Sequence, residues 1–173
     1  MIHAWEKRLG DWLCAWEAEG GSRTALAGAG QALVAEREAL GIHGLWEVPP
    51  IMLAATLDDG WGRGLEVIRS FASAAGMDVR FLGLCQGAEA ILSACRELSP
   101  ALVGLTVLQG FSDEDLIKIG KNLAPGTLLV AGGAAFSADP DLAETAGVDF
   151  VARDAAGFLR FLLDRRADIA PGF

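Results

Sequence analysis

The sequence has little positive charge. Lysine and arginine together number 14 against 23 aspartate and glutamate residues, which gives a formal net charge of −9 and a pI of about 4.6. Because phosphate contacts need lysine and arginine, this balance argues against nucleic-acid binding through a basic face. An anionic membrane would repel the chain for the same reason. Neither nucleic acid nor membrane is an expected partner.

Cysteines and long apolar runs are also scarce. Cys14, Cys85 and Cys95 have no CxxC spacing, so we expect reduced thiols in a cytoplasmic protein, each a small buried residue. The N-terminal segment alternates apolar and charged residues and has no signal-peptide core. No apolar run approaches the ~20 residues that a transmembrane helix needs. The sequence therefore predicts no targeting segment.

Catalytic motifs are lacking as well. The sequence shows no Ser–His–Asp arrangement, no readable pair of catalytic carboxylates and no Cys/His metal cluster. Its two histidines are His3 and His43. We expect His43, in the linker before the first strand, to be an exposed linker residue; an approach to the strand ends is the alternative.

The composition nevertheless favours a folded protein. Hydrophobic residues make up 52% and charged residues 21% of the 173 residues, enough for one domain and a small extra element. Before Pro49-Pro50, one predicted helix carries Trp5, Trp12 and Trp16 on one face, and a second spans 24–40. We predict an N-terminal helical extension over residues 1–46 and an α/β domain over residues 47–173.

The second section alternates strands and helices. The predicted strands are 51–57, 78–84, 101–108, 127–131 and 148–151. The predicted helices are 65–75, 87–98, 113–123, 140–145 and 154–165, the third of them capped by Ser112. Apolar strands with short α-helical crossovers predict a doubly wound, five-stranded parallel sheet of the flavodoxin-like, Rossmann-like class. Ligands of such folds bind at the carboxyl ends of the strands, near the topological switch point.

Three short motifs lie at these strand ends. Asp59-Gly60-Trp61-Gly62-Arg63-Gly64 follows the first strand, Thr106-Val107-Leu108 ends the third, and Gly132-Gly133 follows the fourth. In order and spacing they resemble Asp-x-His-x-x-Gly, Ser-x-Leu and Gly-Gly of the cobalamin-binding domain shared by methionine synthase, methylmalonyl-CoA mutase and small methyltransferase corrinoid proteins. The resemblance covers roughly residues 50 to 165.

This resemblance implies cobalamin as the cofactor, with its dimethylbenzimidazole tail threaded between strands one and three. It implies that Gly64 leaves room for the tail, that the Thr106 hydroxyl bonds to it, and that the glycine pair admits the nucleotide loop. The implied cofactor-binding residues are Asp59, Gly60, Trp61, Gly64, Thr106, Leu108, Gly132 and Gly133. Ordinary turn chemistry explains the glycines equally well, and strand preference explains Thr106.

The sequence departs from the family at its metal ligand. Trp61 stands where the family has its cobalt-ligating histidine, and an indole N–H only donates hydrogen bonds. Asp59 then has no imidazole to orient, and no metal-ligating residue is expected in this loop. Three possibilities remain open. A corrinoid could bind with its lower face on Trp61, or it could bind with its own base still on cobalt. The domain could instead hold another planar ligand such as heme, or none. Cys85 is an alternative metal or heme ligand.

These features favour a carrier, sensor or accessory subunit of a corrinoid-dependent methyl-transfer system over a complete enzyme, because the chemistry would belong to the cofactor. A methyltransferase or regulatory protein is the expected partner. Four tryptophans, Trp5, Trp12, Trp16 and Trp46, could shield a corrinoid, form a homodimer, or pack within the chain.

Two other functions fit less well. A degenerate receiver-like interaction domain would explain the acidic pair Asp58-Asp59, although Thr106 occupies the phosphoacceptor position. A nicotinamide site is weaker still, because Gly60, Gly62 and Gly64 form GxGxG and not GxGxxG.

Overall fold

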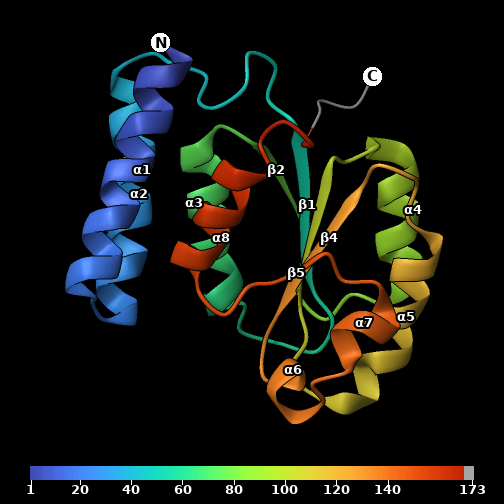
Figure 1. The fold of residues 1–173 in the computed structure, drawn as a ribbon. Helices are drawn as coiled ribbons and strands as arrows, with labels where there is room; N and C mark the ends of the chain where they lie inside the picture. The colour runs from blue at the N-terminus through green and yellow to red at the C-terminus, as the bar shows by residue number, and fades with distance from the viewer. Residues whose placement is uncertain (170–173) are drawn as a thin grey trace.

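The computed structural model describes residues 1–169 and contains one five-stranded parallel sheet in the order β2-β1-β3-β4-β5 (Figure 1). The strands are β1 (Ile51–Thr56), β2 (Asp78–Gly83), β3 (Leu102–Thr106), β4 (Leu128–Gly132) and β5 (Phe150–Val151). This order is that of flavodoxin-like doubly wound folds, so the predicted fold class is confirmed. The topological switch point lies between β1 and β3.

Helices cover both faces of the sheet (Figure 1). α3 (Arg63–Ala75) and α8 (Ala155–Asp164) lie on one face; α4 (Ala88–Leu98), α5 (Asp113–Asn122) and α7 (Leu142–Ala146) lie on the other. Successive side chains of a strand point to opposite faces. Accordingly, Met52 packs into the cluster under α3 and α8, whereas Leu53 packs into the cluster under α4 and α5. Burial on both faces explains why the strands read as continuous apolar runs.

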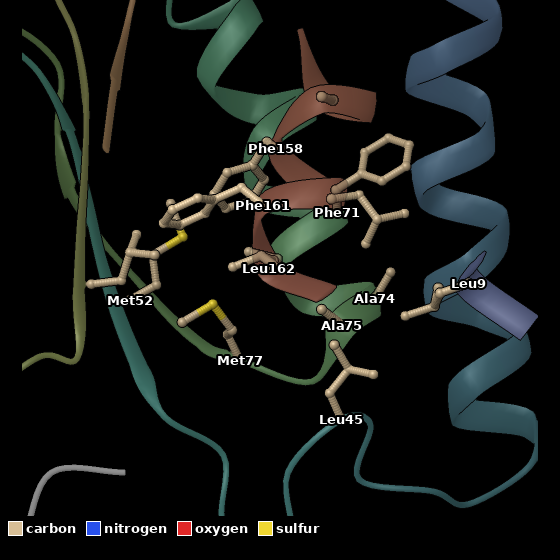
Figure 2. Close-up of a cluster of buried hydrophobic side chains, with 14 of the residues drawn as sticks. Leu9, Leu45, Met52, Phe71, Ala74, Ala75, Met77, Phe158, Phe161 and Leu162 are labelled. Carbon is tan, nitrogen blue, oxygen red and sulfur yellow. The ribbon is translucent and has the colours of Figure 1, made fainter. Parts of the chain in front are cut away.

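Two N-terminal helices form a further layer outside α3 and α8 (Figure 1). They are α1 (Ile2–Glu19) and α2 (Arg23–Ala39), and the Ser22 hydroxyl caps α2 by accepting the Ala25 N–H at 3.1 Å. Leu9 of α1 points toward Ala74 of α3, and Met52 points from the sheet toward α8 (Figure 2). One hydrophobic cluster therefore runs from the N-terminal helices to the sheet. That residues 1–46 and 47–173 are separate units stays a prediction.

The tryptophans before β1 pack within the chain. Trp5 is 1% exposed, and its indole N–H donates to the Ala74 carbonyl at 2.9 Å. Trp46 donates to the Arg166 carbonyl at 3.1 Å. Trp12 stacks on Trp16, with ring centroids 5.6 Å apart. Intramolecular packing, one of the three predicted roles, is thus established for Trp5 and Trp46; a homodimer through this layer stays a prediction.

Short elements differ most from the sequence prediction. A 3-10 turn, η1 (Gly110–Ser112), and a single helical turn, α6 (Ala135–Ala138), were not predicted, and β5 has two residues. Elements of two to four residues carry no recognisable hydrophobic period. In the described part of the chain, no helix has the length and apolar composition that a bilayer crossing requires.

The cysteines also differ from expectation. All three are unpaired, but Cys14 and Cys85 are exposed, so the expectation that each is buried is wrong for these two. Cys95 on α4 is half-buried, and this burial raises the pKa of its thiol to about 11, against a smaller opposing effect of Arg96. Cys95 therefore comes nearest to the expected small buried residue, although it is only half-buried.

Candidate functional site

The register of the sheet brings the three motifs together. Thr56 at the end of β1 pairs with Thr106 at the end of β3, which in turn pairs with Gly132 at the end of β4. The first motif follows Thr56, the second begins at Thr106, and the third begins at Gly132. All three therefore meet at the edge where the parallel strands end, hereafter the carboxyl edge, at the bottom of Figure 1.

Thr56 ties the loops after β1 and β2 together. It is fully buried, its hydroxyl donates to the Asp59 carbonyl at 2.6 Å, and the same oxygen accepts the Cys85 N–H at 2.9 Å. Cys85 has a φ of +52°, and its neighbour Gln86 donates its backbone N–H to the Thr56 carbonyl at 2.8 Å. Thr56 was not among the residues predicted from the sequence, because a threonine in an apolar run resembles an ordinary strand residue. Its position directly before the loop was the available signal.

Asp59 fixes the backbone of Trp61. The residue is 9% exposed, and its Oδ1 accepts the Trp61 backbone N–H at 2.8 Å. Gly62 follows with a φ of +66°, a left-handed conformation that suits glycine, and α3 begins at the next residue. The carboxylate that would orient a histidine in the family pattern thus positions the main chain of the tryptophan.

Exposed apolar side chains gather in the loops of this edge. Trp61 is 80% exposed, with the Arg63 guanidinium 5.4 Å from its ring centroid. Leu108 and Phe111, in the loop after β3, are 37% and 74% exposed. Large apolar side chains grouped on a surface mark an interaction site more often than single ones do. We call Trp61, Leu108 and Phe111 the apolar rim.

Asp58 joins the loop after β1 to the loop after β3. Its Oδ1 accepts the Leu108 N–H at 2.7 Å, and its Oδ2 accepts the Gln109 N–H at 2.8 Å and the Ser112 hydroxyl at 2.9 Å. The Ser112 hydroxyl makes no capping bond to α5, so the predicted capping interaction is wrong. Ser112 has φ −92° and ψ 1°, not the extended backbone usual for an N-cap residue, and its hydroxyl donates to Asp58.

The same contacts bear on the receiver-like alternative. Asp58 was considered only as half of an acidic pair, but both of its oxygens are committed to the β3 loop. Among residues 1–169, no group of three or more His, Cys, Asp or Glu side chains is placed to hold a metal ion. The acidic pair is therefore a structural feature of the loop in this conformation.

The predicted glycines differ in what they do. A Cβ on Gly132 would lie 2.6 Å from the Ala152 carbonyl oxygen, and one on Gly133, whose φ is +115°, would lie 2.2 Å from that of Val107. The protein's own backbone therefore requires these two glycines. A Cβ on Gly60 or Gly64 would meet nothing within 4 Å, so the start of α3 faces open space.

Thr106 is placed for an outside contact. It is half-buried at the end of β3, between Thr56 and Gly132. Its hydroxyl takes no part in the side-chain hydrogen bonds that join these loops, whereas the Thr56 hydroxyl takes part in two. A ligand at this edge would find the Thr106 hydroxyl the more available of the two.

Both histidines lie at the opposite edge of the sheet. The His43 side chain is exposed, and its carbonyl oxygen packs against Gly76, directly before β2 begins. His3 lines a hollow with Trp46 and Arg166. The six residues of β1 separate that edge from the carboxyl edge by about 20 Å at 3.3 Å per residue. The expectation that His43 is an exposed linker residue is confirmed.

The space between β1, β3 and α8 is filled. A Cβ on Gly104 of β3 would lie 2.5 Å from the methyl carbon of Met52, whose side chain belongs to the cluster with Phe158 and Phe161 (Figure 2). Two surface hollows of about 520 and 420 Å³ lie away from the carboxyl edge, between α2 and α3 and around Trp46. The apolar rim suits a planar macrocycle, whereas a tail threaded into the sheet would require Met52 to move. Methionine is flexible enough to allow this.

Comparisons with known proteins agree with this geometry. The sequence model of one family, the B12 binding domain, matches residues 49–160. The match includes all three motifs and begins after α1 and α2. A search of the curated proteins found no match.

Two solved structures are similar in fold. One is a novel cobalamin-binding protein from Desulfitobacterium hafniense DCB-2, with a TM-score of 0.79 and 19% identity over 94% of this chain and 80% of that one. The other is the monomethylamine corrinoid protein of Methanosarcina barkeri, with a TM-score of 0.56 and 17% identity over 66% of this chain and 57% of that one. At such identities the similarity concerns the fold.

Proposed function

Because this chain belongs to the B12-binding domain family, we propose that it binds a corrinoid at the carboxyl edge of its sheet without a histidine ligand to the cobalt. The observation that carries the proposal is the exposed side chain of Trp61, which the motif resemblance aligns with the family's histidine. An indole N–H cannot coordinate a metal. Support comes from His3 and His43, which both lie at the opposite edge.

The residues of the carboxyl edge divide the binding role. The apolar rim offers Trp61, Leu108 and Phe111 for contact with the flat macrocycle. Gly60 and Gly64 leave open space around the start of α3, and Thr106 offers a hydroxyl. Gly132 and Gly133 shape the turn that closes this edge beside Thr106.

The corrinoid, when bound, supplies the methyl-transfer chemistry. The chain's own residues hold and orient it. The filled space over Gly104 favours a benzimidazole tail that stays outside the sheet; a threaded tail requires Met52 to shift. Heme, the alternative planar ligand, gains no support from the family match.

We propose that the chain acts as a carrier, sensor or accessory subunit whose partner is a methyltransferase or regulatory protein. Support for a carrier comes from the corrinoid protein of M. barkeri, which shares the fold. The three unpaired cysteines favour a reducing compartment, so we retain the cytoplasm as the expected location. We also retain a homodimer through α1 and α2 as a prediction.

Calorimetry and electron paramagnetic resonance test this proposal together. Apo protein is titrated with hydroxocobalamin, methylcobalamin and hemin, and the bound Co(II) state is examined with 15N-labelled histidine. We expect heat from the corrinoids and no labelled nitrogen on cobalt. Nitrogen splitting from the benzimidazole would indicate that the tail of the corrinoid is coordinated to cobalt. If this splitting is absent, the tail has been displaced from the metal. A tight hemin complex without heat from any corrinoid would overturn the proposal.

A further inference from the structure

We propose that Asp58 is a positioning residue for the corrinoid site: it holds the loop after β3 so that Phe111 and Leu108 present their side chains to the macrocycle. The inference rests on the proposed function and concerns a residue outside the three family motifs. Asp58 directly precedes Asp59, the first residue of the first motif.

The Asp58 clamp, defined by its bonds to Leu108, Gln109 and Ser112, crosses the switch point. α3 leaves β1 toward one face of the sheet, while α5 leaves β3 toward the other. The two loops therefore diverge directly beyond neighbouring strands, and a crevice between them is the expected ligand site of such a fold. The three hydrogen bonds of 2.7–2.9 Å that the β3 loop donates to this one carboxylate set the separation of the two loops.

The clamp brackets Phe111 in the chain. Two donors, Leu108 N–H and Gln109 N–H, precede Phe111, and the third, the Ser112 hydroxyl, follows it. The 3-10 turn Gly110–Ser112 lies between these anchor points. The backbone that carries a highly exposed aromatic ring is thus held on both sides by a single carboxylate. Holding a contact side chain in place before binding reduces the entropy lost on binding.

Asp59 provides an independent parallel. Its carboxylate accepts the backbone N–H of Trp61, the other strongly exposed aromatic residue of the rim. Two adjacent carboxylates therefore fix the main chain of two exposed aromatic residues, one in each loop. Core packing does not account for this, because neither ring is buried.

Three variants test the inference. Asp58→Asn keeps the shape but replaces one acceptor oxygen by an NH2 that faces N–H donors. Ser112→Ala removes one of the three bonds and leaves the charge unchanged. Asp149→Asn is the matched control, because its Oδ2 also accepts a backbone N–H, that of Leu129, at 2.7 Å, far from the rim.

The readouts are the hydroxocobalamin Kd by calorimetry, the visible circular dichroism of the bound corrinoid, and amide exchange at residues 108 and 109 in the apo protein. We expect Asp58→Asn to speed that exchange, weaken binding about tenfold or more, and change the dichroism, since bonds to a charged acceptor are lost. Ser112→Ala should weaken binding about threefold. Asp149→Asn should leave the Kd within about twofold of the wild-type value. This should hold even if Asp149→Asn lowers the thermal stability as much as Asp58→Asn does.

The outcomes separate the two proposals. If wild-type protein binds hydroxocobalamin and both clamp variants bind it equally tightly while residues 108 and 109 exchange faster, the clamp is only structural and the inference is overturned. If wild-type protein binds no corrinoid, the proposed function fails and the inference fails with it. If Asp58→Asn does not fold, Ser112→Ala decides alone, and an unchanged Kd and dichroism in that variant overturns the inference.

Discussion

The tryptophans of the N-terminal layer and Trp61 have opposite surroundings. Trp5 is buried and its indole N–H is bonded to a backbone carbonyl, and Trp46 is bonded in the same way. Trp61 is exposed, and the Arg63 guanidinium lies 5.4 Å from its ring centroid. The first two are explained by packing and hydrogen bonding within the fold. Trp61 gains neither, which is why we assign it to ligand binding.

A second pair makes the same contrast within the sheet. Thr56 and Thr106 are neighbours in register. The Thr56 hydroxyl is buried and used twice by loop backbone, whereas Thr106 is only half-buried and takes no part in those bonds. Of these equivalent positions on adjacent strands, Thr56 holds the loops, and we propose that Thr106 faces the ligand. Each contrast can be tested by substituting both members.

Trp5→Ala and Trp61→Ala should separate stability from affinity most strongly. Trp5→Ala leaves a cavity in the cluster and an unpaired Ala74 carbonyl, so we expect a loss of about 3–5 kcal/mol of unfolding free energy. Trp61→Ala should change stability by less than about 0.5 kcal/mol and weaken hydroxocobalamin binding about tenfold or more. Urea unfolding and calorimetry measure the two effects. Equal affinity losses in both variants would contradict the contrast.

Thr56→Val and Thr106→Val form the next pair. Thr56→Val leaves the Asp59 carbonyl and the Cys85 N–H without their partner, and we expect a loss of about 1–3 kcal/mol of unfolding free energy. Thr106→Val should leave stability nearly unchanged and reduce corrinoid affinity by about 0.5–1.5 kcal/mol. The same two measurements apply. An unchanged affinity in Thr106→Val would show that no part of the corrinoid reaches this hydroxyl.

The fold class could be predicted from the sequence because β1, β3 and β4 are buried on both faces and read as apolar runs. The motif residues came together as expected because parallel register aligns the strand ends. The loop contacts could not be predicted in this way. Asp58 reaches Ser112 from 54 positions away in the chain, and only the packed sheet brings them together. The capping of α5 by Ser112 was predicted from local sequence, but Ser112 ends a 3-10 turn and lacks the extended backbone usual for a capping residue.

Trp61→His should change the ligand set with little change in stability. Asp59 Oδ1 holds the backbone of residue 61, which leaves Oδ2 for an imidazole N–H that would orient the new side chain. We expect labelled-histidine nitrogen splitting in the paramagnetic resonance of Co(II)-cobalamin bound to this variant and none in wild type. Labelled nitrogen on wild-type cobalt would identify His3 or His43 as the ligand and contradict our assignment of Trp61.

The thiols provide the smallest and most local test. Cys85 is exposed beside the Thr56 network at the carboxyl edge, Cys14 is exposed on α1, and Cys95 is half-buried on α4. Alkylation requires the thiolate. Burial raises the Cys95 pKa to about 11, so iodoacetamide at pH 8 should spare Cys95, and its modification should rise only as the pH approaches 11.

Bound methylcobalamin, kept in the dark, should slow modification of Cys85 but not of Cys14, because only Cys85 lies at the edge assigned to the corrinoid. Peptide mass spectrometry measures all three rates. If methylcobalamin binds and yet protects Cys14 while Cys85 reacts as before, the corrinoid lies against the N-terminal layer, and the contrast between the two regions is reversed.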